Sequence, residues 1–394
     1  MKRLFTARRS TALAGAAMLS TALLLTACGT SGGGGGGGDT GGMPTELGDT
    51  EGAISILAWP GYVEDGSNDP AVDWVSAYED ATGCEVTVKT FGTSDEALNL
   101  MKSGEYDVVS ASGDASLRLV AGGDVAPVNT DLLENYDGIF DFLKMQSWNS
   151  VDGVSYGVPH GYGANLLMWN TDVYPGGLDS WSAVFDDAGD NSGAVTAYDS
   201  PIYIADAAVY LMSTQPDLGI TNPYSLDADQ LAAAVDLLKA QREHIGEYWS
   251  DYLKEIQAFE TGDSVVGTTW QVIQNSITTG NTEVSLPKEG TTGWSDTWMI
   301  ASESEHPNCA YAWLDYIASP EANAQATGYF GEAPSSQAAC DFREDCEAYH
   351  AGDADYASQI WYWSTPIKEC LDGRTDVDCT DYSEWTTAWA EIKG

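Results

Sequence analysis

The chain alternates between short apolar runs and longer segments with helical periodicity. Ala53–Trp59 is a mostly apolar run that predicts a buried strand, and Glu85–Thr90 alternates between polar and apolar residues as a half-buried strand does. Between them, apolar residues recur at helical spacing over Pro70–Thr82 and stop at Gly83, a common helix end. This order of strand, helix and strand predicts an α/β fold with a parallel sheet.

The same alternation continues along the rest of the chain. It predicts helices at 95–103, capped by Ser94, and at 226–244, and strands at 106–109, 165–169 and 264–270. We find no internal repeat and no second linker in this stretch. The pattern therefore favours lobes that are interwoven along the chain over domains strung in series.

The first 27 residues are typical of a secretory signal. Four basic residues, at positions 2, 3, 8 and 9, precede an apolar stretch over 12–25 that is too short to span a bilayer stably. Leu25-Thr26-Ala27-Cys28 resembles the bacterial lipobox, in which the cysteine becomes the lipidated first residue. Residues 29–42 are rich in Gly and predict a flexible tether. An ordinary signal followed by a chance Cys28 is the alternative.

The charge balance is strongly acidic. Sixty Asp and Glu face 16 Lys and Arg, giving a net charge of −44, which would become −48 without the four basic signal residues. Such a polyanion is a poor partner for nucleic acid or anionic lipid. A hydrophobic content of 43%, with 14 Trp and 20 Tyr, is enough to build a core. The acidity suits a cationic ligand, but it would equally serve solubility or salt adaptation.

Six cysteines remain besides Cys28, and an even number in an exported protein predicts disulfides. The short spacings favour Cys340–Cys346 and Cys370–Cys379, which leaves Cys84 and Cys309, although the other pairings of six cysteines stay open. A metal site is disfavoured, because the chain has no C-x-x-C motif and its four His, at 160, 244, 306 and 350, are scattered.

Unusual residues gather at the predicted strand ends, which is where open α/β sheets bind ligands. Aromatic faces attract organic cations, and a carboxylate fixes the charge. The residues in such positions are Trp59, Tyr62, Ser110, Ser112, Trp270, Trp294 and Asp296. Together they predict an aromatic cleft for a cation. Each ring taken alone could equally be core packing, and Asp296 could equally be a cap or turn residue.

These stretches resemble the periplasmic spermidine/putrescine-binding proteins of bacterial ABC importers over most of residues 52–335. The matching stretches are Trp59-Pro60-Gly61-Tyr62, Tyr106–Val109 with the serines that follow, Tyr156–Pro159, Leu286–Asp296 and Gly328-Tyr329. The resemblance implies a two-lobed periplasmic-binding-protein fold of the α/β class. Each lobe would be a mainly parallel sheet flanked by helices, with the ligand cleft between the lobes.

The expected organisation has four parts. Residues 1–27 would be the lipoprotein signal peptide, and 28–51 the lipidated Cys28 with its Gly-rich tether. Lobe 1 would combine 52–163 with 294–335, and lobe 2 would combine 164–293 with 336–394.

The resemblance also implies which side chains bind the ligand. Aromatic rings at Trp59, Tyr62, Trp270, Trp294 and Tyr329 would sandwich the methylene chain of a linear polyamine. Asp296 would contact one amine, and Asp199 falls near a second amine-binding Asp of the family.

Two departures from the family pattern affect this site. A family tyrosine two positions after the serine reads here as Asp114, behind Ser112, and a glutamate three positions after Asp199 reads as Ile202. Asp114 could replace the lost carboxylate, or the ligand could carry fewer charges. The tail over 361–394 has no counterpart that we can place.

We therefore expect a monomeric substrate-binding lipoprotein on the outer face of the bacterial membrane, which delivers a polyamine to permease subunits without any cofactor. A binding protein for another ligand, such as a betaine, a thiamine-like cation, a sugar or ferric ion, is the first alternative. A secreted hydrolase with paired carboxylates is the second. It is disfavoured because we find no motif that places an acid and a nucleophile together, no H-E-x-x-H motif and no P-loop.

Overall fold

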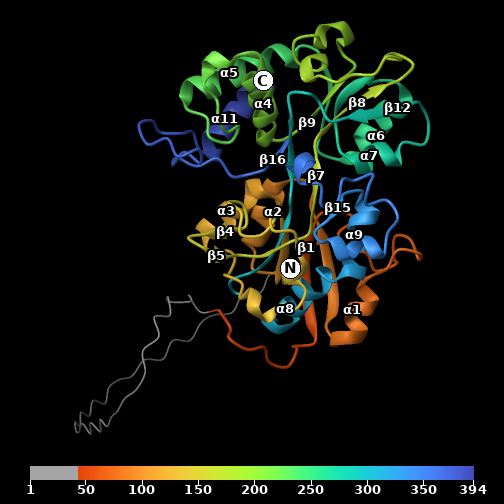
Figure 1. Ribbon diagram of the computed structural model, residues 1–394, viewed down its shortest axis with the longest axis vertical. Helices are drawn as coiled ribbons and strands as arrows, with labels where there is room; N and C mark the ends of the chain where they lie inside the picture. Colours follow the sequence, from red (N-terminus) through yellow and green to blue (C-terminus); the bar gives the residue numbers. More distant parts are fainter. Residues whose placement is uncertain (1–42) are drawn as a thin grey trace, which may run out of the picture. The chain divides into compact units, whose positions relative to one another are not determined.

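The structure is a computed structural model that describes residues 43–394 (Figure 1). The expected signal peptide, Cys28 and most of the tether lie outside these residues. Among the helices of the described part, none is long and apolar enough to cross a membrane.

The first sheet has the strand order β2-β1-β3-β14-β6. Strand β1 pairs in parallel with β2 and β3, and β14 runs antiparallel to β3 and β6. The strands are β1 (Ala53–Ala58), β2 (Glu85–Thr90), β3 (Val108–Ala111), β6 (Val158–Pro159) and β14 (Thr297–Ile300). The helices of this lobe are α1 (Val75–Thr82), α2 (Ser94–Met101), α3 (Gly113–Gly122), α8 (Pro307–Ile317) and α9 (Pro320–Phe330).

The second sheet has the order β10-β9-β11-β8-β12. Strand β9 pairs in parallel with β10 and β11, whereas β8 runs antiparallel to β11 and β12. The strands are β8 (Leu166–Asn170), β9 (Val195–Tyr198), β10 (Ile245–Trp249), β11 (Val266–Thr269) and β12 (Thr282–Ser285). The helices here are α4 (Ile204–Thr214), α5 (Ala228–Arg242), α6 (Tyr252–Thr261), α7 (Gln271–Ser276) and α11 (Tyr382–Lys393).

A third sheet, ordered β15-β7-β13-β16, connects the two groups (Figure 1). Its strands are β7 (Gly161–Ala164), β13 (Thr291–Trp294), β15 (Ala333–Pro334) and β16 (Ile360–Tyr362). Strand β7 leads from β6 to β8, and β13 leads from β12 to β14, so the chain crosses between the lobes at both strands. The short elements are a β4 (Ser150–Val151) and β5 (Val154–Ser155) hairpin, helix α10 (Ala354–Ala357), and 3-10 turns at 130–132, 136–138, 181–183, 188–191, 201–203, 216–218 and 337–341.

Two hydrophobic cores confirm the two-lobed α/β fold. One forms around the β1 sheet with the aromatic residues of α8, and the other around the β9 sheet with Trp385 and Trp389 of α11. The pairing within each sheet is mixed rather than mainly parallel, because returning strands β14 and β8 join it antiparallel. Ala357, with the partly buried Tyr349 and Ala351, packs on the first core although we expected 336–394 in the second lobe.

Local chemistry explains where the helices begin. Helix α1 starts at Val75 rather than Pro70, because the backbone N–H of Gly66 bonds to the carbonyl of Val72 and holds that segment in a turn. Thr93, not Ser94, caps α2, since its side chain accepts the N–H of Glu96. Helix α5 begins with a complete capping box, in which Asp227 and Gln230 satisfy each other's backbone N–H groups, as the strong sequence signal for this helix favours.

The three favoured disulfides are confirmed: Cys84–Cys309, Cys340–Cys346 and Cys370–Cys379. The first joins the start of β2 to α8 across a sequence separation of 225 residues. It therefore ties together the two chain segments of the first lobe. The other two close short loops in the last quarter of the chain.

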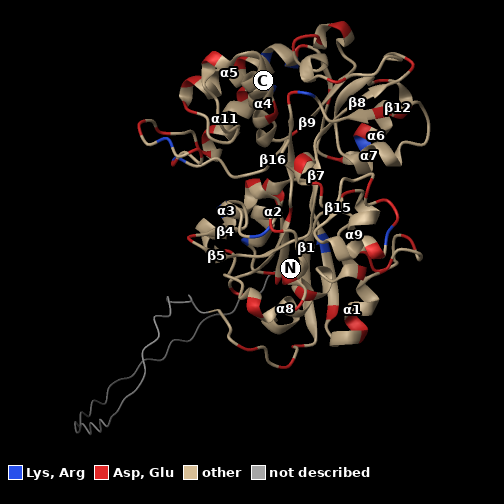
Figure 2. Ribbon diagram, viewed as in Figure 1, with Lys and Arg blue, Asp and Glu red and all other residues tan. Residues whose placement is uncertain are grey.

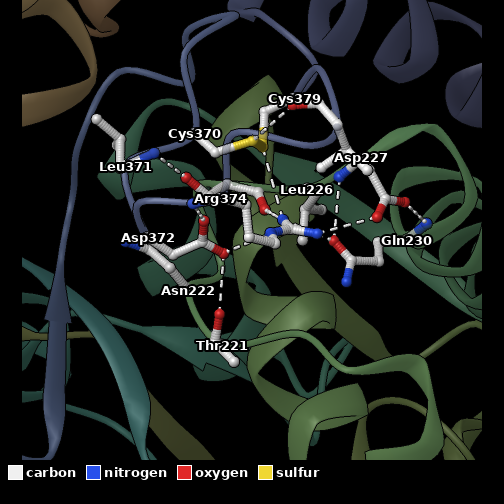
Figure 3. A network of polar contacts seen from close by, with 12 residues as sticks. Thr221, Asn222, Leu226, Asp227, Gln230, Cys370, Leu371, Asp372, Arg374 and Cys379 are labelled. Carbon is white, nitrogen blue, oxygen red and sulfur yellow. Dashed lines mark hydrogen bonds and ion pairs between the residues drawn. A yellow bond between two sulfur atoms is a disulfide. The ribbon is translucent and has the colours of Figure 1, made fainter.

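The loop closed by Cys370–Cys379 is also held by one arginine (Figure 3). Arg374 donates from Nε to Asp372 at 2.9 Å and from Nη1 to Asp227 at 3.0 Å. A further bond reaches Gln230 at 3.1 Å. Since Asp227 and Gln230 form the capping box of α5, these charge-assisted bonds fix the tail to the second lobe.

Candidate functional site

Three predicted tryptophans meet between the lobes. Trp59 directly follows β1, Trp270 directly follows β11, and Trp294 ends β13. Their ring centroids lie 6.2 Å apart for Trp59 and Trp270 and 5.7 Å apart for Trp270 and Trp294, in edge-to-face arrangements. Each comes from a different sheet, so strand ends deliver the rings to one place, as the sequence predicted.

A cavity of about 710 Å³ lies beside these rings, and we call it the aromatic cavity. Trp59, Trp270 and Tyr329 line it, and Tyr329 is 46% exposed at its edge. Phe91, Tyr252 and Phe330 add further aromatic surface to its walls, which the sequence analysis missed. Its volume falls within the usual range for small-molecule sites.

Three carboxylates line the aromatic cavity, namely Glu64, Glu96 and Asp251, and none of its lining residues is Lys or Arg. Asp251 follows β10 closely, so the strand-end rule used for the tryptophans could have found it, whereas Glu96 lies inside α2. Each also has a structural role, because Glu96 accepts the N–H of Gly92 and Asp251 caps α6. The cavity surface is therefore both aromatic and anionic.

Asp296 lies behind the rings, in a fully enclosed carboxyl cluster. Its Oδ2 accepts the hydroxyl of Tyr62 at 2.8 Å, and the same hydroxyl lies 3.4 Å from Oε2 of Glu332. Trp294 donates from Nε1 to that Glu332 oxygen at 2.6 Å. The remaining oxygens, Asp296 Oδ1 and Glu332 Oε1, are buried and have no hydrogen-bond partner among the described residues. Sequence reasoning missed Glu332, which lies three residues after Tyr329.

Burial controls the charge state of this cluster. It raises the pKa of Asp296 to about 7, against the opposing effect of the hydrogen bond from Tyr62. It also raises the pKa of Glu332, to which the nearby Asp296 charge adds. An ordinary aspartate titrates near ~4. Both carboxyl groups therefore stay protonated to a higher pH than exposed carboxyl groups do, unless a cation pairs with them.

His160 supplies no compensating charge at neutral pH. Its Nδ1 accepts the indole N–H of Trp298 at 3.0 Å, so a neutral ring carries its proton on Nε2. That Nε2 lies 3.5 Å from Oε1 of Glu332. Burial lowers the pKa of His160 to about 3, which keeps the ring neutral.

Ser112 and Asp114 lie at the start of α3, beneath Trp59. Ser112 accepts the indole N–H of Trp59 at 3.1 Å and so orients the ring. Asp114 is buried and accepts the hydroxyl of Ser94 at 2.7 Å. It lines neither the aromatic cavity nor the smaller cavity beside Glu332. Glu332, in contrast, lines the smaller cavity and accepts the indole N–H of Trp294.

Asp199 is not brought to this cluster. Lys393 donates to Asp199 Oδ1 at 2.6 Å, and Trp389 donates to the same oxygen at 3.1 Å. Both partners belong to α11, in the tail that the sequence resemblance did not cover. The charge of Asp199 is therefore neutralised by the chain's own ammonium group. Trp361, in β16, packs partly buried against the second core.

Asp206 is another buried carboxyl group, and its titration should make the folding stability depend on pH. Burial raises its pKa to about 7, whereas the unfolded chain should titrate near ~4. A raised folded-state pKa gives stability that is complete below pH ~4 and is lost as pH rises through about 7. We expect Asp206→Asn to remove about 3 kcal/mol of the stability difference between pH 5 and pH 8. Urea unfolding at both pH values measures this, and an unchanged difference would contradict it.

The described residues contain no group of three or more His, Cys, Asp or Glu arranged to hold a metal ion. Acidic residues are spread over both lobes, whereas basic residues are sparse (Figure 2). Most of the negative charge therefore lies away from the aromatic cavity.

The sequence of this chain is similar to those of known proteins. The sequence model of the bacterial extracellular solute-binding protein family matches residues 73–351. The putrescine/agmatine-binding protein of Pseudomonas aeruginosa strain PAO1 is 25% identical over 283 residues, covering 67% of this chain and 74% of that protein.

Solved structures share the fold at lower identity. A spermidine/putrescine ABC transporter protein from Listeria monocytogenes superimposes with a TM-score of 0.70 at 18% identity, covering 87% of this chain and 99% of that chain. The binding protein MotA of A. tumefaciens B6, solved in complex with glucopine, gives a TM-score of 0.66 at 16% identity, covering 87% and 100%.

Proposed function

Because the chain belongs to the family of bacterial extracellular solute-binding proteins, we propose that it captures a polyamine such as putrescine or spermidine and delivers it to an ABC importer. The observation that carries this proposal is the buried cluster of Asp296 and Glu332 beside Trp294. Each carboxyl group leaves one oxygen without a partner among the described residues. Burying a carboxylate that has no cation beside it costs free energy, because the charge loses its water. A bound ammonium group would offset that cost by pairing with the charge.

The rings supply the second half of the interaction. An ammonium group over an indole face gains roughly 0.5–2 kcal/mol, and several such contacts add up to micromolar affinity or better. Trp59 and Trp270 also offer apolar surface to the methylene chain of a polyamine. The relatives named for putrescine and agmatine support this ligand class.

The proposed site lies between two lobes, which suits capture by closure. A ligand that contacts both lobes shifts the open and closed populations toward the closed form. The closed form then presents one defined two-lobed surface to the permease. We propose that the protein acts in this way as a monomer, without a cofactor and without enzyme activity of its own.

The N-terminal segment fits this role. We propose that residues 1–27 direct export, that Cys28 carries the lipid anchor, and that the segment up to residue 51 tethers the lobes to the outer face of the membrane. Lobe 1 would comprise 52–163 and 294–335, together with the part of the tail before 358 that packs on its core, and lobe 2 the remainder.

A related ligand with a single positive charge is the alternative. Ile202 is 1% exposed and offers no carboxylate where the resembling family has one, and Asp199 is paired with Lys393. These two positions remove two of the anionic groups that the resembling family uses. The carboxylates that remain at the aromatic cavity are Glu64, Glu96 and Asp251.

A thermal-shift screen tests the proposal. Putrescine, cadaverine, agmatine and spermidine at millimolar concentration should raise the melting temperature by several degrees, because they bind the folded state only. Glycine betaine, thiamine and glucose serve as comparison ligands of other classes. A shift with glucose and none with any amine would reject the polyamine function and leave the fold assignment intact.

A further inference from the structure

The hydroxyl of Tyr62 lies between two carboxyl groups but carries only one hydrogen. It is 2.8 Å from Asp296 Oδ2 and 3.4 Å from Glu332 Oε2. It can donate to one of them, and the other contact is favourable only when that carboxyl group donates a proton back to the hydroxyl oxygen. All three side chains are almost fully buried, so water does not screen the arrangement. The geometry thus calls for one extra proton in the cluster.

The groups facing the two carboxyls do not provide a neutralising cation. His160 is neutral, and Asp114 and Tyr198 bring no positive charge. Arg343 donates to the backbone carbonyl of Glu332 and to Asp345 rather than to the Glu332 carboxylate, and its charge lowers the Glu332 pKa only in part, since burial still raises it. The side chains around the cluster therefore leave its charge to be balanced by a proton or by a ligand.

Glu332 also faces a cavity. It lines a space of about 250 Å³ together with Trp294, Tyr162 and Gln271, which we call the Glu332 cavity. Trp294 contacts Trp270 at 5.7 Å and Phe330 at 6.2 Å, and both of these line the aromatic cavity. Trp294 thus lines the Glu332 cavity and packs against two residues of the aromatic cavity, and its indole N–H points at Glu332. The smaller space suits one end of a ligand rather than its whole length.

On the basis of the proposed function, we propose that Glu332 joins Asp296 in binding one primary ammonium group of the ligand, and that this group displaces a proton which the two carboxyls share in the free protein. The ammonium N–H groups would then bond to Asp296 Oδ1 and Glu332 Oε1. The displaced proton passes to the solvent, so the net charge of the cluster is conserved. Burial, which raises the pKa of both carboxyls, supports this exchange.

Two consequences follow for specificity. Glu332, paired with Asp296, would take over from the family glutamate whose position Ile202 occupies here. The ligand contacts would therefore differ from those of the resembling family. A primary ammonium or guanidinium group can satisfy both oxygens, whereas a quaternary ammonium has no N–H and leaves them unpaired. We expect primary amines to bind in preference to betaines.

Calorimetry of the Glu332→Gln variant tests the proposal. The amide keeps the size of the side chain and an oxygen for Trp294, but it removes the charge and the titration. Putrescine is titrated into wild type and variant at pH 6.5, in two buffers that differ in ionisation enthalpy. Wild type should release about one proton per ligand as the cluster exchanges it. The variant should bind roughly 10- to 100-fold more weakly and release fewer protons.

Glu255→Gln is the matched control. Glu255 is also buried, with a raised pKa, but its carboxyl bonds to Thr196 and Thr269 and lines neither cavity. Its variant should bind and release protons as wild type does. If Glu332→Gln matched wild type in both affinity and proton release, the inference would be wrong while the proposed function would stand.

A measurement without ligand distinguishes failure of the proton-sharing inference from failure of the proposed function. The indole N–H signal of Trp294, assigned with Trp294→Phe, should move in an NMR titration with a midpoint near the pKa of about 7 for Asp296, and the movement should shrink in Glu332→Gln. A flat signal between pH 5 and pH 9 would overturn proton sharing whatever the ligand. Absence of amine binding by wild type would instead reject the proposed function, and with it the ammonium site.

Discussion

Asp296→Asn is expected to bind putrescine about 100-fold more weakly than wild type, a loss of about 3 kcal/mol. The asparagine fits the same space and can still accept the Tyr62 hydroxyl, so the cavity keeps its shape. It lacks the negative charge, and the buried ammonium group then has one anionic partner fewer. Isothermal titration calorimetry at pH 8, where the wild-type Asp296 is largely ionised, measures the difference.

Asp206→Asn is the matched control for this experiment. Asp206 is equally buried and has a pKa of about 7, yet it lies in the first turn of α4, and its side chain bonds to Thr292 rather than to Tyr62 of the carboxyl cluster. The two variants make the same chemical change in similar burial, so only Asp296→Asn should weaken the ligand. Equal affinity of Asp296→Asn and wild type would show that Asp296 is structural.

Loss of the Cys84–Cys309 disulfide should have the largest effect on stability. In the chain-entropy account, closing a loop of 225 residues contributes about 5 kcal/mol, because it restricts the unfolded chain. Cys340–Cys346, with a separation of 6 residues, should contribute only about 2 kcal/mol. The Cys84→Ala/Cys309→Ala and Cys340→Ala/Cys346→Ala variants therefore form a matched pair. Urea unfolding measures both.

The reason lies in the topology of the first lobe. Cys84 precedes β2, and Cys309 lies in α8, after the chain has crossed to the second lobe and returned. Both are fully buried in the first core, so the variant also loses packing. A larger stability loss from the Cys340/Cys346 variant than from the Cys84/Cys309 variant would contradict this account.

The strand-end rule picked out three tryptophans that lie together in the structure, but it missed Phe91, Tyr252 and Phe330 of the aromatic cavity. Trp59, Trp270 and Trp294 each follow or end a strand, and open α/β sheets bind ligands beyond the carboxyl ends of their strands. Asp251 also follows a strand closely and caps α6, whereas Glu96 lies inside α2, which Thr93 caps. Local sequence cannot separate a cap that also lines a cavity from one that does not.

Contacts over long sequence distances could not be foreseen. Asp199 is paired with Lys393, and Glu332 meets Tyr62 across 270 residues. Both depend on where the tail and α9 pack, and no periodicity encodes that. The mixed sheets have the same origin, since β14 joins β3 only after the chain has returned from the other lobe.

The net charge of −44 carries less information about the ligand than it first suggests. Acidic residues cover both lobes, and only a few of them line the aromatic cavity (Figure 2). The surface charge concentrates cations near the protein in general. In our proposal, selection among cations falls to buried groups such as Asp296 and Glu332, which a surface count does not reveal.

The central claim is that an amine binds in the aromatic and carboxylate site between the lobes. Isothermal titration calorimetry of the purified protein with putrescine, at pH 8 and near-physiological salt, tests it most directly. We predict one site per chain with micromolar or tighter affinity, weakened by Asp296→Asn and unaffected by Asp206→Asn. No heat of binding with putrescine, cadaverine, agmatine or spermidine, or equal binding by the Asp296→Asn variant, would contradict the claim.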